Sequence, residues 1–179
     1  FGVGDPVEAT PKFIREALKK AADEFSATGY PLYNGRAKFR QAVSEYTRLR
    51  FNVELNPDTE ICSTVGSKEA IFHFPEILIN RGDMVLIPSP GYPPYKRGTT
   101  FSEGVRYFYP LLEENNFCPD LEALPPEIIK AAKLLWLCYP NNPTGAIATR
   151  KFFEKAVEFA RANNIIIASD ECYVDVYMG

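Results

Sequence analysis

Histidine is the scarcest catalytic residue type in this sequence, since His73 is the only one among 179 residues. One histidine excludes any triad or metal site that is built on several histidines. His73 itself lies within the apolar run 71–74, which favours the flank of a packed helix over a catalytic role. The sequence also has no apolar run long enough to span a membrane and no basic cluster, and its net charge is −3. Neither a membrane nor nucleic acid is therefore expected as a partner.

Cysteine is also sparse, and no CxxC pair occurs. The four residues are Cys62, Cys118, Cys138 and Cys172. Cys62 and Cys138 lie in strand-like runs, so we expect both to be buried, reduced thiols. Reduced thiols favour a cytoplasmic location.

Short β-branched runs alternate with helical patterns along most of the chain. Strands are expected at residues 61–65, 84–87, 105–109, 133–139 and 165–169, and helices at 11–25, 36–51, 67–80, after Pro93, within 121–132 and at 149–164. This alternation predicts an α/β fold with a mostly parallel sheet and helices on both faces.

Polar and turn-forming residues follow the expected strands. The segments are GSK at 66–68, PSPGY at 88–92, PNNPTG at 140–145 and DECY at 170–173. Ligands of parallel sheets bind beyond the carboxyl ends of the strands. We therefore expect these segments to line one pocket.

Two of these segments carry opposite chemistry. Gly66 and Ser67 join a strand to a helix, where free backbone amides suit a phosphate, although a serine-capped helix has the same pattern. Asp170 follows an apolar strand and therefore needs a partner. That partner is either a helix start, a salt bridge or a cationic ligand such as a protonated ring nitrogen, to which Tyr173 would add a hydrogen bond.

Two further residues suit a flat ligand. Tyr92 is held between glycine and proline, where its ring either packs or serves as a stacking platform. Asn142 carries an amide that donates and accepts hydrogen bonds. A phosphorylated, cationic heteroaromatic ring satisfies the whole set, and pyridoxal phosphate has these features.

Six segments, in order along the chain, carry a family resemblance. They are FGVGDP, YPLYNG with Phe39-Arg40, GSKEA, RGDMVLIPSPGYPPY, YPNNPTG and SDECY. The chain resembles the class I and II aminotransferases of the pyridoxal-phosphate fold type I superfamily, and within them the diaminopimelate aminotransferases. The resemblance implies that residues 1–52 form an N-terminal arm with helices, and that residues 53–179 form part of the large cofactor-binding domain.

The resemblance also implies roles for individual residues. By motif, pyridoxal phosphate would be bound by Gly66, Ser67, Lys68, Tyr92, Asn142, Asp170, Tyr173 and Tyr30, and the substrate by Gly4 and Asn142. Asp170 would pair with the ring nitrogen, while Asn142 and Tyr173 would contact the phenolic oxygen. Tyr30 would reach the phosphate bound by a partner subunit, which implies a homodimer.

One feature of the family is missing from the sequence. The Schiff-base lysine expected after SDECY is absent, and none of the ten lysines matches it. We therefore expect a fragment that is inactive alone, with no catalytic residue of its own. The full-length protein is expected to move an amino group between an amino acid and a 2-oxo acid, with LL- or succinyl-diaminopimelate of lysine biosynthesis as substrates. Alternatives are a C–S lyase or decarboxylase of the same fold, or the aminotransferase-like sensor domain of a transcription regulator.

Overall fold

The computed structural model describes residues 7–176. The chain forms two compact units, one up to Ser63 and the other from Thr64 onward. The division by contacts thus falls later than the boundary at residue 52 expected from the sequence. The assignment of the two parts as arm and large domain stays a prediction.

The first unit contains two helices, α1 (Lys12–Glu24) and α2 (Ala37–Phe51). Both were expected from the sequence, but none of the residues of α1 is buried. Arg40 on α2 is buried, and its guanidinium donates to the carbonyl of Pro57 at 2.7 Å and to Asp58 Oδ1 at 3.0 Å. Arg40 thus joins α2 to the segment that follows it.

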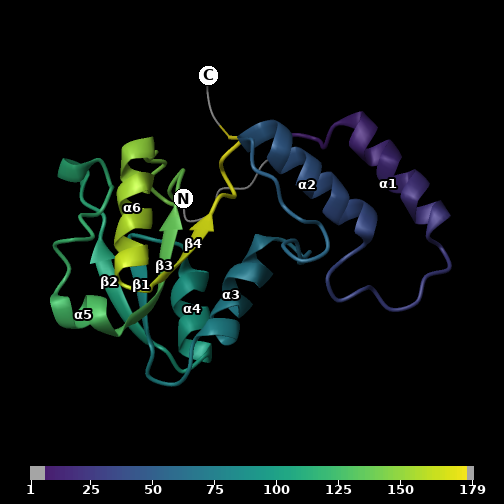
Figure 1. Ribbon diagram of the computed structural model, residues 1–179. Coiled ribbons are helices and arrows are strands. Elements are labelled where there is room, and N and C mark those ends of the chain that lie inside the picture. The colour runs from purple at the N-terminus through teal and green to yellow at the C-terminus, as the bar shows by residue number, and fades with distance from the viewer. Residues whose placement is uncertain (1–6, 177–179) are drawn as a thin grey trace. The chain divides into compact units, whose positions relative to one another are not determined.

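The second unit contains a four-stranded sheet. Its strands are β1 (Met84–Ser89), β2 (Val105–Pro110), β3 (Ala132–Cys138) and β4 (Ile166–Asp170). They lie in the order β2-β1-β3-β4, and every pairing is parallel (Figure 1). The predicted parallel sheet is therefore confirmed, and all four carboxyl ends lie at one edge.

Helices cover both faces of this sheet. They are α3 (Ser67–Leu78), α4 (Pro93–Phe101), α5 (Pro126–Ala131) and α6 (Arg150–Ala162), with a 3₁₀ turn, η1 (Glu113–Asn115). Helices α3 and α4 lie side by side on one face, and α6 lies over the other (Figure 1). Thr149 caps α6 as expected, because its hydroxyl accepts the backbone N–H of Phe152 at 3.2 Å.

Strand β3, one of the two inner strands, lies between two apolar clusters. Trp136 and Cys138 point to the cluster under α3 and α4, whereas Leu135 and Leu137 point to the cluster under α6. Residues paired in a parallel register share a face of the sheet. Because Asp170 pairs with Cys138, its side chain belongs to the α3 and α4 face.

Two expectations from the sequence are wrong. Residues 61–65 form no strand, and Val65 is 91% exposed. The backbone N–H of Ser63 bonds the carbonyl of Asn34 at 3.2 Å, but no ladder of such bonds continues along the segment. Cys62, expected to be buried, is consequently exposed, whereas Cys138 is buried as predicted. Apolar β-branched residues form a strand only where a neighbouring strand pairs with them.

All four cysteines are free thiols in the structure. No helix within residues 7–176 is both long and apolar enough to pass through a membrane.

Candidate functional site

Asp170 is the last residue of β4 and is only 8% exposed. Both of its carboxylate oxygens accept hydrogen bonds. The hydroxyl of Tyr95 donates to Oδ2 at 2.6 Å, and the backbone N–H of Cys172 donates to Oδ1 at 3.2 Å. A buried carboxylate needs such donors, because burial alone disfavours its charged form.

Tyr95 reaches Asp170 from the first turn of α4 and is fully buried. Its ring stacks on Trp136 with centroids 4.9 Å apart and an interplanar angle of 22°. Burial, and then the hydrogen bond to Asp170, raises the pKa of Tyr95 far above 10.0, so the phenol stays protonated. No role was predicted for Tyr95 from the sequence, although its place three residues after Tyr92, at the start of an expected helix, was a usable signal.

Asp170 lines a pocket of about 570 Å³ on the α3 side of the sheet. Ser67, at the start of α3, lines the same pocket, and Phe74 and Trp136 make part of it apolar. Burial raises the pKa of the Cys172 thiol, and a hydrogen bond with Ser67 partly offsets this rise. Ser67 therefore lies next to the residue that donates to Asp170.

The start of α3 offers uncapped backbone amides to this pocket. Gly66 precedes the helix with φ 74°, a left-handed conformation that favours glycine, and no side chain caps the first turn. Ser67 and Lys68 are exposed. The carboxylate of Glu69 accepts the backbone N–H of Val65. The free amides and the helix dipole make this a place for an anion.

The two adjacent asparagines after β3 have different surroundings. Asn141 is buried and holds the turn, since its Oδ1 accepts the backbone N–H of Thr144 at 3.2 Å and the Thr144 hydroxyl at 2.8 Å. Its backbone N–H also donates to the carbonyl of Ala146 at 2.8 Å. Asn142 is partly exposed, and its backbone lies close enough to the Cys138 thiol to lower that thiol's pKa, although burial raises the pKa overall. Asn141 is therefore the structural amide of the pair, while the predicted role of Asn142 stays a prediction.

The remaining predicted residues lie in several places. Tyr92 directly precedes α4, and its ring meets Tyr95 edge to face at 5.8 Å. Tyr173 is 42% exposed in the turn after β4. Tyr30 belongs to the first unit, where its side chain is fully exposed, and Gly4 lies outside the described residues. The structure thus brings Ser67 and Asp170 together in one pocket, and it links Tyr92 to Asp170 through Tyr95.

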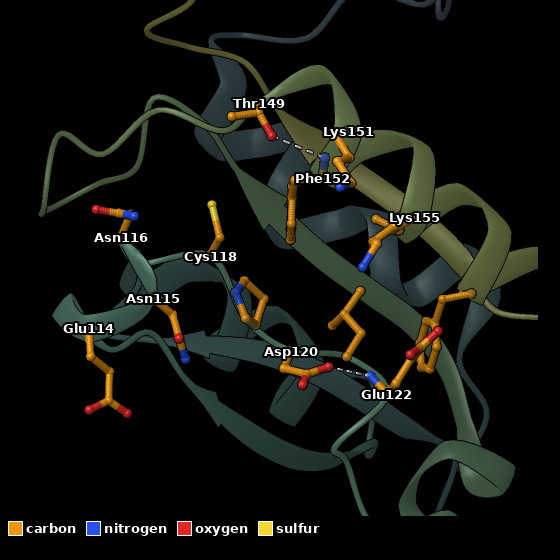
Figure 2. A pocket seen from close by; sticks show the side chains of 14 residues that line it. Glu114, Asn115, Asn116, Cys118, Asp120, Glu122, Thr149, Lys151, Phe152 and Lys155 are labelled. Atoms are coloured by element: carbon orange, nitrogen blue, oxygen red, sulfur yellow. Dashed lines mark hydrogen bonds between the residues drawn. The ribbon is translucent and has the colours of Figure 1, made fainter.

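A second pocket, of about 510 Å³, lies on the opposite face between α6 and residues 114–122. Figure 2 shows Lys155 of α6 pointing toward the loop that carries Asp120 and Glu122. The Asp120 carboxylate accepts the backbone N–H of Glu122 at 3.2 Å and so stabilises the turn in which it lies. Within the described residues, no group of histidine, cysteine, aspartate and glutamate could hold a metal ion.

His73 lies on α3, as the sequence predicted for a helix flank. Its Nδ1 lies 2.7 Å from Glu76 Oε1, one turn along the same helix. The histidine is thus paired within α3 and does not line the pocket of Asp170.

The pocket lined by Asp170 and Ser67 offers groups for both charges. A buried carboxylate at the end of β4 suits a cationic hydrogen-bond donor, and the start of α3 suits an anion. An elongated ligand with a phosphate at one end and a protonated ring nitrogen at the other fits this donor set. Pyridoxal phosphate is such a ligand.

Comparison with known proteins gives an independent result. The family model "Aminotransferase class I and II" matches residues 1–179. The LL-diaminopimelate aminotransferase of Aquifex aeolicus is 49% identical over 179 residues, which are all of this chain and 46% of that protein. The enzyme of the same name from Syntrophobacter fumaroxidans is 45% identical over the same share of each chain. The chain thus spans less than half the length of these curated relatives.

Solved structures agree with the sequence relatives. Substrate-bound BacF from Bacillus subtilis superimposes with a TM-score of 0.91 at 39% identity, covering 95% of this chain and 43% of that one. An aminotransferase from Neisseria meningitidis Z2491 gives a TM-score of 0.90 at 31% identity, covering 99% and 45%. The α/β unit has the fold of the fold type I aminotransferase large domain. The chain belongs to the class I and II aminotransferase family.

Proposed function

We propose that the complete protein is a pyridoxal-phosphate-dependent aminotransferase that acts on LL-diaminopimelate. The observation that carries the proposal is the pocket shared by Asp170 and Ser67, which pairs a buried carboxylate with the start of a helix. The names of the relatives, at 49% and 45% identity, support LL-diaminopimelate as the amino donor.

The cofactor supplies an electron-accepting ring when it is bound. Asp170 would hold a proton at the ring nitrogen, because a buried anion stabilises the positive charge there. The amides after Gly66, with Ser67 and Lys68, would hold the phosphate. Tyr92 would cover one face of the ring.

Asn142 and Tyr173 would donate hydrogen bonds to the phenolic oxygen of the cofactor. Asn142 and Gly4 would also contact the substrate, and a 2-oxo acid would be the second substrate. Tyr30 would serve a partner subunit in a homodimer, which agrees with the full exposure of its side chain in this chain. The expected cytoplasmic location stays a prediction.

The reaction conserves the amino group. It leaves the α-carbon of the donor, which becomes a 2-oxo acid, and it is added to the α-carbon of the acceptor, which becomes an amino acid. The two half-reactions are the reverse of one another, so no external oxidant or reductant is needed. Proton transfer at the α-carbon is acid–base catalysis, for which no residue of this chain is assigned.

The experiment is an amino-transfer assay of the complete protein with LL-diaminopimelate and 2-oxoglutarate, in which glutamate is measured. We expect turnover in the wild type and a loss of about 100-fold or more in Asp170→Asn, since the amide carries no charge to hold the ring proton. Asp120→Asn, in the pocket on the opposite face, is the matched control and should keep full activity. Equal activity in the Asp170 and Asp120 variants, or none in the wild type with any amino donor, would refute the proposal.

A further inference from the structure

We propose that Tyr95 is a positioning residue for Asp170, and that its hydroxyl holds the carboxylate in the orientation that receives the ring nitrogen of pyridoxal phosphate. This inference rests on the proposed function of the pocket. It assigns a role to a side chain that lies behind Asp170 and does not line the pocket itself.

The Tyr95 ring is held on several sides. It is fully buried and stacks on Trp136 of β3, and Tyr92 meets it edge to face. Helix α4, which carries it, packs so closely on α3 that a Cβ at Gly98 would lie 2.3 Å from the carbonyl oxygen of Phe72. The hydroxyl therefore has a fixed position, and its 2.6 Å bond to Asp170 Oδ2 fixes the carboxylate in turn.

The hydrogen bonds of Asp170 leave room for a ligand. A carboxylate has about four acceptor positions on its two oxygens. Tyr95 occupies one position on Oδ2, and the backbone N–H of Cys172 occupies one on Oδ1. The Cys172 side chain also hydrogen-bonds Asp170, so at least one of the four positions remains for a ring N–H. Without the hydroxyl, the buried carboxylate would keep only the longer 3.2 Å bond of these two.

The groups that face Asp170 are Tyr95 of α4, Cys138 of β3 and Cys172 in the turn after β4. Burial raises the pKa of all three groups, so each is protonated and uncharged near neutral pH. The donor to Asp170 is consequently present across the working pH range. Hydrogen bonds donated to an ionised carboxylate stabilise its charged form, which is the form that a protonated ring nitrogen requires.

The test compares two cofactors in one variant. Tyr95→Phe removes the hydroxyl and keeps the ring on Trp136. Equilibrium dialysis of the complete apoprotein measures the dissociation constants of pyridoxal phosphate and of its 1-deaza analogue, in which C–H replaces the ring nitrogen. Tyr109→Phe is the matched control, because Tyr109 is equally buried but donates to the carbonyl of Trp136 and not to Asp170.

In the wild type we expect tighter binding of pyridoxal phosphate than of the analogue. In Tyr95→Phe this preference should fall by about tenfold, the size of one hydrogen bond to a charged group. The preference should stay unchanged in Tyr109→Phe. Partial unfolding weakens the apparent binding of both cofactors by the same factor, so it cancels in the ratio.

Three results would overturn the inference. If Tyr95→Phe keeps the wild-type preference, Tyr95 contributes only packing. If Tyr109→Phe loses as much of the preference as Tyr95→Phe, the effect comes from general loosening of the core. A wild-type protein that binds both cofactors equally would show that Asp170 does not meet the ring nitrogen, and it would refute the proposed function as well.

Discussion

Replacing Gly98 with alanine should disturb both the fold of the second unit and its pocket. Gly98 lies in α4 at the contact with α3, and these two helices carry Tyr95 and Ser67. A Cβ at position 98 would lie 2.3 Å from the carbonyl oxygen of Phe72 and 3.1 Å from its Cα. Both atoms belong to the backbone, so no side chain can rotate away to make room.

The size of the effect follows from this geometry. Real Cβ atoms essentially never come within 3.0 Å of such an atom, so the helices must separate by at least about 0.7 Å. Overpacking of this kind costs about 1–3 kcal/mol. The same displacement of α4 would lengthen the 2.6 Å bond between Tyr95 and Asp170 beyond the usual range for an O–H···O hydrogen bond. Cofactor binding should therefore weaken as well.

Urea unfolding and equilibrium dialysis of pyridoxal phosphate measure the two effects. Gly29→Ala is the control, because a Cβ at that position meets nothing within 4 Å, and its free energy of unfolding should change by less than about 1 kcal/mol. An unchanged free energy of unfolding in Gly98→Ala would show that α3 and α4 are not in backbone contact. Lower stability with unchanged cofactor binding would contradict the link between this contact and Asp170.

Three further predictions concern other parts of the chain. Thr149→Ala should lower the free energy of unfolding by about 1 kcal/mol, since Phe152 N–H loses its cap, and Thr149→Ser should restore it in urea unfolding. Arg40→Ala should lower the free energy of unfolding by about 2–3 kcal/mol, because the carbonyl of Pro57 loses a buried, charged hydrogen-bond donor. Limited proteolysis within residues 52–63 should then be faster than in the wild type. Lys38→Ala is the control, because the Lys38 side chain is 86% exposed, and it should change neither the free energy of unfolding nor the rate of proteolysis. Burial raises the pKa of Tyr109 well above 10.0, so its contribution to stability is complete below about pH 10 and is lost as the pH rises further. Above about pH 10, Tyr109 should therefore lower the free energy of unfolding by about 1.4 kcal/mol per pH unit. Tyr109→Phe should remove this contribution from the plot of unfolding free energy against pH.

The sequence determined much of the second unit by itself. Its four strands and the helices between them follow from local patterns, and Thr149 caps α6 where expected. A strand followed by a helix and another strand forms a parallel pair because the crossover returns the chain to the same end of the sheet. That rule places Tyr92, Asn142 and Asp170, which follow or end β1, β3 and β4, near one edge without any knowledge of contacts.

Only the tertiary structure decided how that edge is supported. The bond between Tyr95 and Asp170 joins residues 75 positions apart, and no local pattern encodes a contact at that separation. Likewise, the sequence could not assign the structural role to Asn141, because the two adjacent amides are chemically identical. Residues 61–65 have the composition of a strand, yet they form none, since a strand is stabilised by its neighbour and not by its own residues.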